Sequence, residues 1–362
     1  MRPLDGLLVL DLTRLLPGAA ATMQLANFGA EVIKIEEPER GDYARSIPPL
    51  LDGEGAVFRS VNRGKKSVAL DLKTDAGRAA FLKLAARADI VVESFRPGAM
   101  ERLGIGYEKL HELNERLIYV SITGYGQSGP LRNMAGHDIN YLARGGALDL
   151  NGAAGGPPIV PGIQIADLAG GAMQAVIGVL LALTARAKTG QGQAVDVSMT
   201  EGVAALLPVP LGWYAATGAT PARGDGVLTG RYACYRIYEA AEGRFVAVGA
   251  LEPKFWRGLC EALGRRQFID DQFAEDPRRT EIIAELARIF RTRTAEEWFV
   301  LLGPADVCVT PVWRVDEVAA HLGLGPGDSV VTPKLSATPG QLGGPAPRLG
   351  EHNQQIASDL LG

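Results

Sequence analysis

The sequence has 362 residues and a mass of 38.3 kDa, a length that favours two domains over one hydrophobic core. Its hydrophobic content of 47% and charged content of 22% are typical of a soluble globular protein. The formal net charge of -4 excludes nucleic acid as the main partner, because no basic excess is available to neutralise a polymer of phosphates.

The first third of the chain alternates strand-like and helix-like segments. Strands are predicted over residues 7–12, 31–38, 66–72, 88–95 and 116–126, and helices over residues 18–30 and 74–88. The second of these helices has Thr74 or Asp75 as its N-cap. This alternation predicts a Rossmann-like α/β large domain over residues 1–215, with a mostly parallel sheet covered by helices.

The loop after the first strand argues against a dinucleotide cofactor. It reads TRLLPGAAA and contains a single glycine, Gly18. A pyrophosphate-binding loop needs glycines spaced as G-x-G-x-x-G, so that the backbone can approach the ligand. We therefore expect the architecture of a dinucleotide-binding domain without its chemistry.

Residues 168–185 contain no charge and approach the length of a membrane span. Gly170, Gly171 and Gly178, with several alanines, instead suit a helix that packs closely against other protein. We predict a buried helix and no membrane partner.

The pattern changes near residue 225. Residues 231–251 predict a hairpin around the turn AAEGR, residues 251–263 and 278–302 predict amphipathic helices, and residues 306–313 predict a strand. These elements predict a smaller α+β domain over residues 225–325. The Pro- and Gly-rich segment 326–362 is expected to return to the large domain.

Basic residues gather beside the predicted strand ends of the large domain. They are Arg40, Arg63, Lys65, Lys66, Arg96 and Arg102. Loops at the carboxyl ends of parallel strands bind ligands, and arginine and lysine suit phosphates through charge-assisted hydrogen bonds. On composition alone, a solvated surface is the favoured explanation of these charges.

Three residues are candidates for catalysis. His137, in AGHDINY, follows a strand and turn, and an imidazole exchanges protons near neutral pH. Asp167, before the apolar helix, is a candidate base or nucleophile, and Glu252 ends a strand of the small domain. Each also fits a structural role, as a loop residue, a helix N-cap and a surface acid respectively.

Cysteine usage and the N-terminus bear on compartment and metals. The cysteines Cys234, Cys260 and Cys308 form no CxxC pair, so we expect neither disulfides nor a metal site. Residues 1–20 lack the basic, apolar and small-residue order of a signal peptide, so we expect a cytoplasmic protein.

Several stretches together resemble family III coenzyme A transferases, the CaiB/BaiF family, and most closely its α-methylacyl-CoA racemase branch. They include DLTRLLPGAAATMQLANFGAEVIKIE, NRGKKSVALDLK, ESFRPGAMERLG, AGHDINYLA, IADLAGGAM and AVGALEPKFW, and they span nearly the whole chain. The resemblance implies an interlocked homodimer with its active site between domains of both chains. It also implies that the basic residues, Asp138 and Tyr141 bind coenzyme A as part of a thioester substrate, without a prosthetic group.

The resemblance also implies roles for the three candidates. In the racemase branch, residues matching His137 and Asp167 form the acid/base pair, and a glutamate matching Glu252 supports the histidine. Family III transferases use the aspartate matching Asp167 as a nucleophile and often carry a run of glycines, which residues 200–260 lack. We expect a racemase of 2-methyl-branched acyl-CoA thioesters acting through an enolate. An acyl-CoA:carboxylate CoA-transferase and a catalytically silent coenzyme A-binding protein are the alternatives.

Overall fold

The computed structural model describes residues 1–360 and divides the chain into two units. Unit 1 contains Met1–Leu148, Val160–Pro208 and the C-terminal segment from Gly325. Unit 2 contains Asp149–Ile159 and Val209–Leu324. The C-terminal segment therefore groups with unit 1, whereas the loop Asp149–Ile159, which the sequence pattern assigns to the large domain, groups with unit 2.

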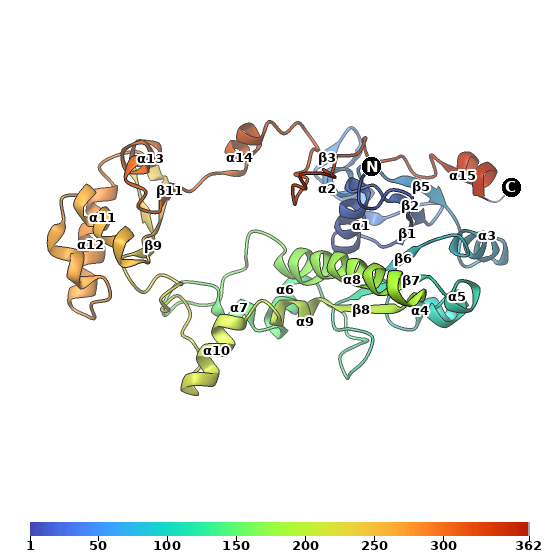
Figure 1. Ribbon diagram of the computed structural model, residues 1–362, viewed down its shortest axis with the longest axis horizontal. Helices are drawn as coiled ribbons and strands as arrows, with labels where there is room; N and C mark the ends of the chain where they lie inside the picture. The colour runs from blue at the N-terminus through green and yellow to red at the C-terminus, as the bar shows by residue number, and fades with distance from the viewer. Residues whose placement is uncertain (361–362) are drawn as a thin grey trace. The chain divides into compact units, whose positions relative to one another are not determined.

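Unit 1 is built on a six-stranded sheet in which every neighbouring pair is parallel, as the sequence predicts (Figure 1). The sheet order is β5-β2-β1-β6-β7-β8. Its strands are β1 (Leu8–Leu12), β2 (Glu31–Glu36), β5 (Lys66–Ala69), β6 (Ile90–Glu93), β7 (Ile118–Thr123) and β8 (Ala194–Ser198). The strand order reverses between β1 and β6, and the crevice outside the carboxyl ends of these two strands is where such sheets bind ligands.

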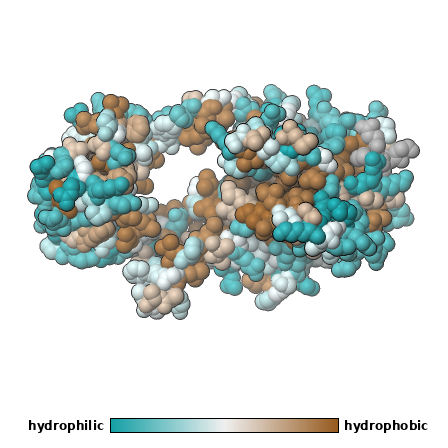
Figure 2. All heavy atoms as spheres, viewed as in Figure 1, coloured by the Kyte–Doolittle hydropathy of each residue, from teal (hydrophilic) through white to brown (hydrophobic). Residues whose placement is uncertain are grey.

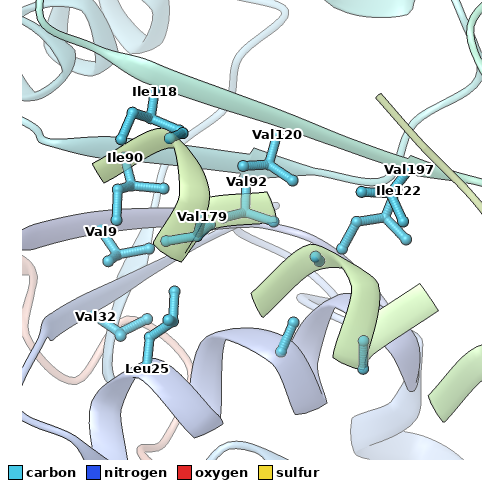
Figure 3. Packing of buried hydrophobic residues seen from close by; sticks show 14 of the residues in the cluster. Val9, Leu25, Val32, Ile90, Val92, Ile118, Val120, Ile122, Val179 and Val197 are labelled. Carbon is cyan, nitrogen blue, oxygen red and sulfur yellow. The ribbon is translucent and has the colours of Figure 1, made fainter. Parts of the chain in front are cut away.

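Helices cover both faces of this sheet. Val9 is in register with Val32 and Ile90, and this row packs against α1 (Pro17–Asn27) and α8 (Gln174–Thr189) (Figure 3). Alternate residues such as Leu10 pack on the opposite face. The helices there are α3 (Asp75–Ala85), α4 (Ala99–Arg102), α5 (Tyr107–Leu113) and α15 (Asn353–Leu360). Burial on both faces explains why these strands are almost continuously hydrophobic.

The apolar segment forms a π-helix, η2 (Ala166–Met173), followed by α8. Its glycines allow the predicted close packing, since a Cβ on Gly170 would lie 2.6 Å from the Met199 carbonyl oxygen and one on Gly178 would lie 2.6 Å from Val195. The other side is exposed in the single chain, where apolar side chains gather over α8 (Figure 2). Among residues 1–360, Ala166–Thr189 is the one helix with the length and composition of a membrane span. The prediction of a buried helix is thus correct for one side only.

Unit 2 has the predicted α+β composition. Its antiparallel sheet contains β9 (Tyr235–Glu239), β10 (Phe245–Gly249) and β11 (Val309–Pro311), with β9 and β10 forming the predicted hairpin. The helices α11 (Pro253–Ala262), α12 (Arg278–Phe290) and α13 (Ala295–Leu302) pack on this sheet through Trp256, Phe290 and Trp298.

The remaining elements are short. They are η1 (Tyr43–Ser46), β3 (Leu50–Leu51), β4 (Glu54–Gly55), α2 (Ala56–Val61), α6 (Asp138–Arg144), α7 (Ala147–Leu150), α9 (Met199–Ala204), α10 (Pro208–Thr217), η3 (Ala241–Gly243), η4 (Arg266–Asp271), η5 (Gly303–Ala305) and α14 (Val315–Leu322).

Candidate active site

A buried ionic network lies at the carboxyl end of β1. The Lys65 ammonium is 2.9 Å from the Asp11 carboxylate, and the Lys34 ammonium pairs with Asp42 at 3.1 Å. Burial by itself would raise the pKa of Asp11, but the two lysines hold it below its ordinary value. Burial lowers the pKa of Lys65 to about 8, although Asp11 opposes this.

This network fixes the loop that leaves β1, Thr13 to Leu16. Asp11 accepts hydrogen bonds from the backbone N–H of Thr13 at 2.9 Å and from its hydroxyl at 2.6 Å. Asp42 accepts the backbone N–H of Leu15, whose φ of 61° is uncommon for a residue other than glycine. Gly18 allows the Thr13 side chain to approach the backbone closely, since a Cβ at position 18 would lie 2.3 Å from that side chain. The lone glycine of this segment therefore serves the turn itself.

The loop presents Arg14, which is absent from the predicted site residues. Its guanidinium lies 5.1 Å from the centroid of the Tyr43 ring and 5.4 Å from that of Phe95, and it donates to the Tyr43 hydroxyl at 3.2 Å. It forms no ion pair with a carboxylate of residues 1–360. A signal for Arg14 was present in the sequence, since it follows the first strand at the position where this sheet architecture binds ligands.

Arg14 and Phe95 line several cavities of unit 1, two of which concern the site. We call one of them the switch-point cavity, because its lining residues Thr13 and Phe95 follow β1 and β6, between which the strand order reverses. Its volume is about 110 Å³, and its walls include Leu72, Lys73 and Leu103. The site cavity, of about 590 Å³, is larger and more polar. Its polar and titratable lining residues are Arg14, Tyr43, Ser94, Arg96, Thr123, Arg132, His137, Asn140, Tyr141 and Asp167.

The site cavity brings together His137 and Asp167, which are 30 residues apart in the sequence. His137 is the N-cap of α6 and its side chain is exposed, whereas Asp167 lies in the first turn of η2 and is half-buried. The pKa of Asp167 is raised to about 6: burial is the largest cause, the Asp138 carboxylate also raises the pKa, and His137 lowers it. A carboxylate and an imidazole on one cavity wall can both exchange protons near neutral pH.

The other polar residues of GHDINY hold this arrangement. The Asn140 side-chain oxygen accepts the His137 backbone N–H at 3.0 Å. The Asp138 carboxylate accepts the Asp167 backbone N–H, also at 3.0 Å. The Tyr141 hydroxyl donates to the Gly136 carbonyl oxygen, and burial raises the pKa of that hydroxyl to about 12.

Of the six predicted basic residues, Arg96 lines the site cavity. The other five line neither cavity: Arg40, Arg63, Lys65, Lys66 and Arg102. Arg40 and Arg102 are next in the sequence to Gly41 and Leu103, which line the switch-point cavity. Arg63 pairs with Asp328 at 3.4 Å and Lys66 with Glu31 at 2.7 Å.

The prediction that Lys65 contacts a phosphate is corrected by the structure. Its side chain is fully buried, and its ammonium donates to Asp11, to the Ala19 carbonyl oxygen and to the Asn62 side chain. Lys65 directly precedes β5, as predicted, but its ammonium is buried against the Asp11 carboxylate, whose charge compensates it.

The structure also places the three remaining predicted site residues, Tyr141, Asp138 and Glu252. Tyr141 lines the site cavity, whereas the Asp138 carboxylate is directed to the Asp167 backbone and is not among the lining residues. Glu252 belongs to unit 2, where it is the N-cap of α11 and its carbonyl oxygen accepts the Phe255 N–H at 2.9 Å. The arrangement described for unit 1 therefore consists of His137 and Asp167.

Comparison with known proteins shows which family the chain matches. Residues 4–353 match CoA-transferase family III. The chain is 38% identical over 320 residues to the human alpha-methylacyl-CoA racemase, covering 88% of this chain and 80% of the relative. It is also 38% identical over 323 residues to the acetyl-CoA:oxalate CoA-transferase of Acetobacter aceti, with 88% and 82% coverage. A CAIB/BAIF family protein from Brucella suis has a similar structure, with a TM-score of 0.85, 30% identity and 99% of both chains covered.

Proposed function

Because the chain belongs to CoA-transferase family III, we propose that it is a racemase of 2-methyl-branched acyl-CoA thioesters. The observation that carries this proposal is that His137 and Asp167 line one cavity. Racemisation needs a group on each face of the carbon α to the thioester, and these two residues are able to accept and return a proton. The 38% identity to the human racemase supports the same reaction.

The proposed reaction is a proton transfer without a covalent intermediate. One of the pair removes the C2 proton, and the electron pair of the C–H bond moves into the thioester to form an enolate. The other residue then donates a proton to the opposite face, and the roles exchange for the substrate of opposite hand. Stabilisation of the enolate oxygen by nearby donors and cations lowers the barrier.

We further propose that coenzyme A lies along the carboxyl ends of β1 and β6. Arg14 and Arg96 line the site cavity without a carboxylate partner among residues 1–360, so they are available for the diphosphate. The switch-point cavity next to them has apolar walls at Leu72, Phe95 and Leu103, which suit a nucleobase.

We also propose a homodimer, and the support for it is an apolar surface formed by Met173 and the α8 helix that follows it. Met173 and Leu181 expose 61% and 66% of their surface, and Ile177 and Leu180 lie on the same helix with more than a third exposed. An apolar row of this kind is typical of a surface that is covered in an assembly. Within the homodimer, we propose that Glu252 supports His137.

A second candidate function is CoA transfer between an acyl-CoA and a carboxylic acid. The 38% identity to the Acetobacter transferase supports it as well. In that reaction the Asp167 carboxylate attacks the thioester carbonyl carbon, the coenzyme A thiolate leaves, and an acyl-enzyme anhydride forms. His137 is then dispensable for the covalent step.

Proton NMR of a 2-methylacyl-CoA in D₂O, without any free carboxylic acid, tests the proposal. Loss of the C2 proton signal with appearance of the opposite epimer is the expected result, and His137→Ala and Asp167→Ala should each abolish racemisation. An unchanged signal, followed by CoA transfer once a carboxylic acid is added, would establish the second candidate instead. Tight coenzyme A binding without either reaction would leave a binding protein.

A further inference from the structure

We propose that Asp138 is a positioning residue that fixes where the side chains of His137 and Asp167 stand relative to each other. This inference rests on the proposed function, in which those two residues exchange protons with the substrate. It differs from the expectation that Asp138 contacts coenzyme A.

The geometry places Asp138 between the two catalytic candidates. It is the residue after His137, and it is the first residue of α6. Its carboxylate accepts the backbone N–H of Asp167 at 3.0 Å, across a sequence separation of 29 residues. A single side chain thus joins the start of α6 to the first turn of η2, the two elements that carry the pair.

The Asp138 carboxylate is directed to the backbone of η2 and does not line the site cavity. Its neighbours His137, Asn140 and Tyr141 line that cavity, whereas Asp138 does not. Without the Asp138 carboxylate, the Asp167 N–H would lose its hydrogen-bond acceptor, and this N–H lies in the first turn of a helix, where no intrahelical acceptor exists. The hydrogen bond therefore satisfies an N–H in the first turn of η2.

Asp138 also contributes charge at Asp167. The charged and titratable groups around the Asp167 carboxyl are His137, Asp138 and Tyr141 from α6. The guanidinium groups on the cavity wall are those of Arg14, Arg96 and Arg132. Burial is the main cause of the raised pKa of Asp167, and the Asp138 charge raises it further. Removing that charge is expected to move the pKa of Asp167 downward.

Two substitutions separate position from charge. Asp138→Asn keeps an oxygen that can accept the Asp167 N–H but removes the charge, whereas Asp138→Ala removes both. Asp75→Ala is the matched control, because Asp75 is likewise the first residue of its helix, α3, and is fully exposed. For each protein, kcat and KM for C2 proton exchange in D₂O are measured from pH 5 to 9.

Asp138→Ala is expected to lower kcat about 100-fold with little change in KM, because a misplacement of about 1 Å has a cost of this size. Asp138→Asn is expected to retain most of kcat, and in both variants the low-pH limb of the rate moves to lower pH. Asp75→Ala should behave as the unsubstituted protein. An unchanged kcat and pH profile in Asp138→Ala would overturn the proposal, and so would an increase in KM alone, which would make Asp138 a ligand of coenzyme A.

Two other outcomes are possible: Asp138→Ala does not fold, or the unsubstituted protein exchanges no C2 proton. If Asp138→Ala does not fold, as judged by thermal unfolding, Asp138→Glu decides, because it keeps the charge and displaces the carboxylate by one methylene group. An unchanged kcat in Asp138→Glu would overturn the proposal. If the unsubstituted protein transfers CoA and exchanges no proton, the racemase proposal fails. The same variants are then compared in CoA transfer, where loss of kcat in Asp138→Ala supports positioning of Asp167 and an unchanged kcat overturns it.

Discussion

The Lys65 ammonium and the Asp11 carboxylate form a 2.9 Å ion pair in which neither side chain is exposed. The hydroxyls of Thr13 and Thr22 also donate to Asp11, at 2.6 Å and 2.7 Å. This pair lies directly beneath the loop that carries Arg14. The stability of the fold and the shape of the site are therefore linked through Asp11.

Asp11→Asn is predicted to destabilise the protein by about 3–5 kcal/mol, because the substitution leaves the buried Lys65 ammonium without its counter-charge. Urea unfolding followed by circular dichroism measures the change. Glu31→Gln is the control, since it breaks the 2.7 Å pair of Glu31 with Lys66, which is partly exposed. That variant should lose at most about 1 kcal/mol. Equal losses in the two variants would contradict a special role for the buried pair.

Glu93, at the end of β6, gives stability a dependence on pH. Burial raises its pKa to about 7 from an ordinary value of 4.5. The folded protein thus holds a proton that the unfolded chain releases, and stability is lost as pH rises from 4.5 through 7. Glu93→Gln removes this effect. As pH rises from 4.5 to 8, the free energy of unfolding of the variant should therefore increase relative to that of the unsubstituted protein by roughly 3 kcal/mol.

Urea unfolding at a series of pH values checks the Glu93 prediction. The Gln side chain retains an oxygen that can accept the Phe95 N–H, which Glu93 binds at 2.7 Å. Glu108→Gln, on the exposed surface of α5, serves as the control and should show no comparable trend. Parallel curves for Glu93→Gln and the unsubstituted protein would show that Glu93 ionises normally in the fold.

Proton exchange should depend on the ionisation of Asp167. The pKa of this carboxyl is raised to about 6, chiefly by burial, and only its ionised form accepts a proton. The rate of C2 proton loss should therefore increase with pH through a midpoint near 6, for the substrate hand on which Asp167 is the base. NMR rates for each epimer between pH 4.5 and pH 8 test this, and a rate that does not fall below pH 6 for either epimer would contradict the raised pKa of Asp167.

Gly124 controls the place of Tyr141 at the site. A Cβ on Gly124 would lie 2.2 Å from the Tyr141 ring, and Tyr141 binds the Gly136 carbonyl oxygen next to His137. Gly124→Ala is expected to displace the ring and lower kcat by about 100-fold. At Gly162 an added Cβ meets no atom of residues 1–360 within 4 Å, so Gly162→Ala should leave kcat unchanged. A fully active Gly124→Ala enzyme would show that the ring can move without harm to the site.

Arg14 is predicted to bind the substrate rather than to take part in the chemistry. Arg14→Met should raise KM for acyl-CoA about tenfold, the loss expected for one charge-assisted hydrogen bond, and should change kcat less. Calorimetry with coenzyme A alone should show the same loss of affinity. Lys188→Met, at the exposed end of α8, is the control for loss of one positive charge. Unchanged affinity in Arg14→Met would remove Arg14 from the proposed ligands.

The sequence by itself determined the parallel sheet, the hairpin of the small domain and the Thr74 cap. These features depend on local patterns, namely apolar strands separated by amphipathic helices, turn residues between two strands, and a side chain that accepts the N–H of Gly77 at 3.1 Å. His137 and Asp167 are candidates by residue type, and the resemblance to a family implies their catalytic roles. Their residue types suit proton transfer, but each alone had a structural explanation as well.

Only the tertiary structure decided which polar residues face a cavity and which face the protein. Lys65 and Arg14 both lie near strand ends, yet Lys65 is held by the buried Asp11 carboxylate, while Arg14 is held between the Tyr43 and Phe95 rings at the site. Asp138 likewise turns to the Asp167 backbone, although its neighbours line the cavity. These choices depend on partners distant in the sequence, because a buried charge or N–H must be compensated by whatever group the fold brings beside it.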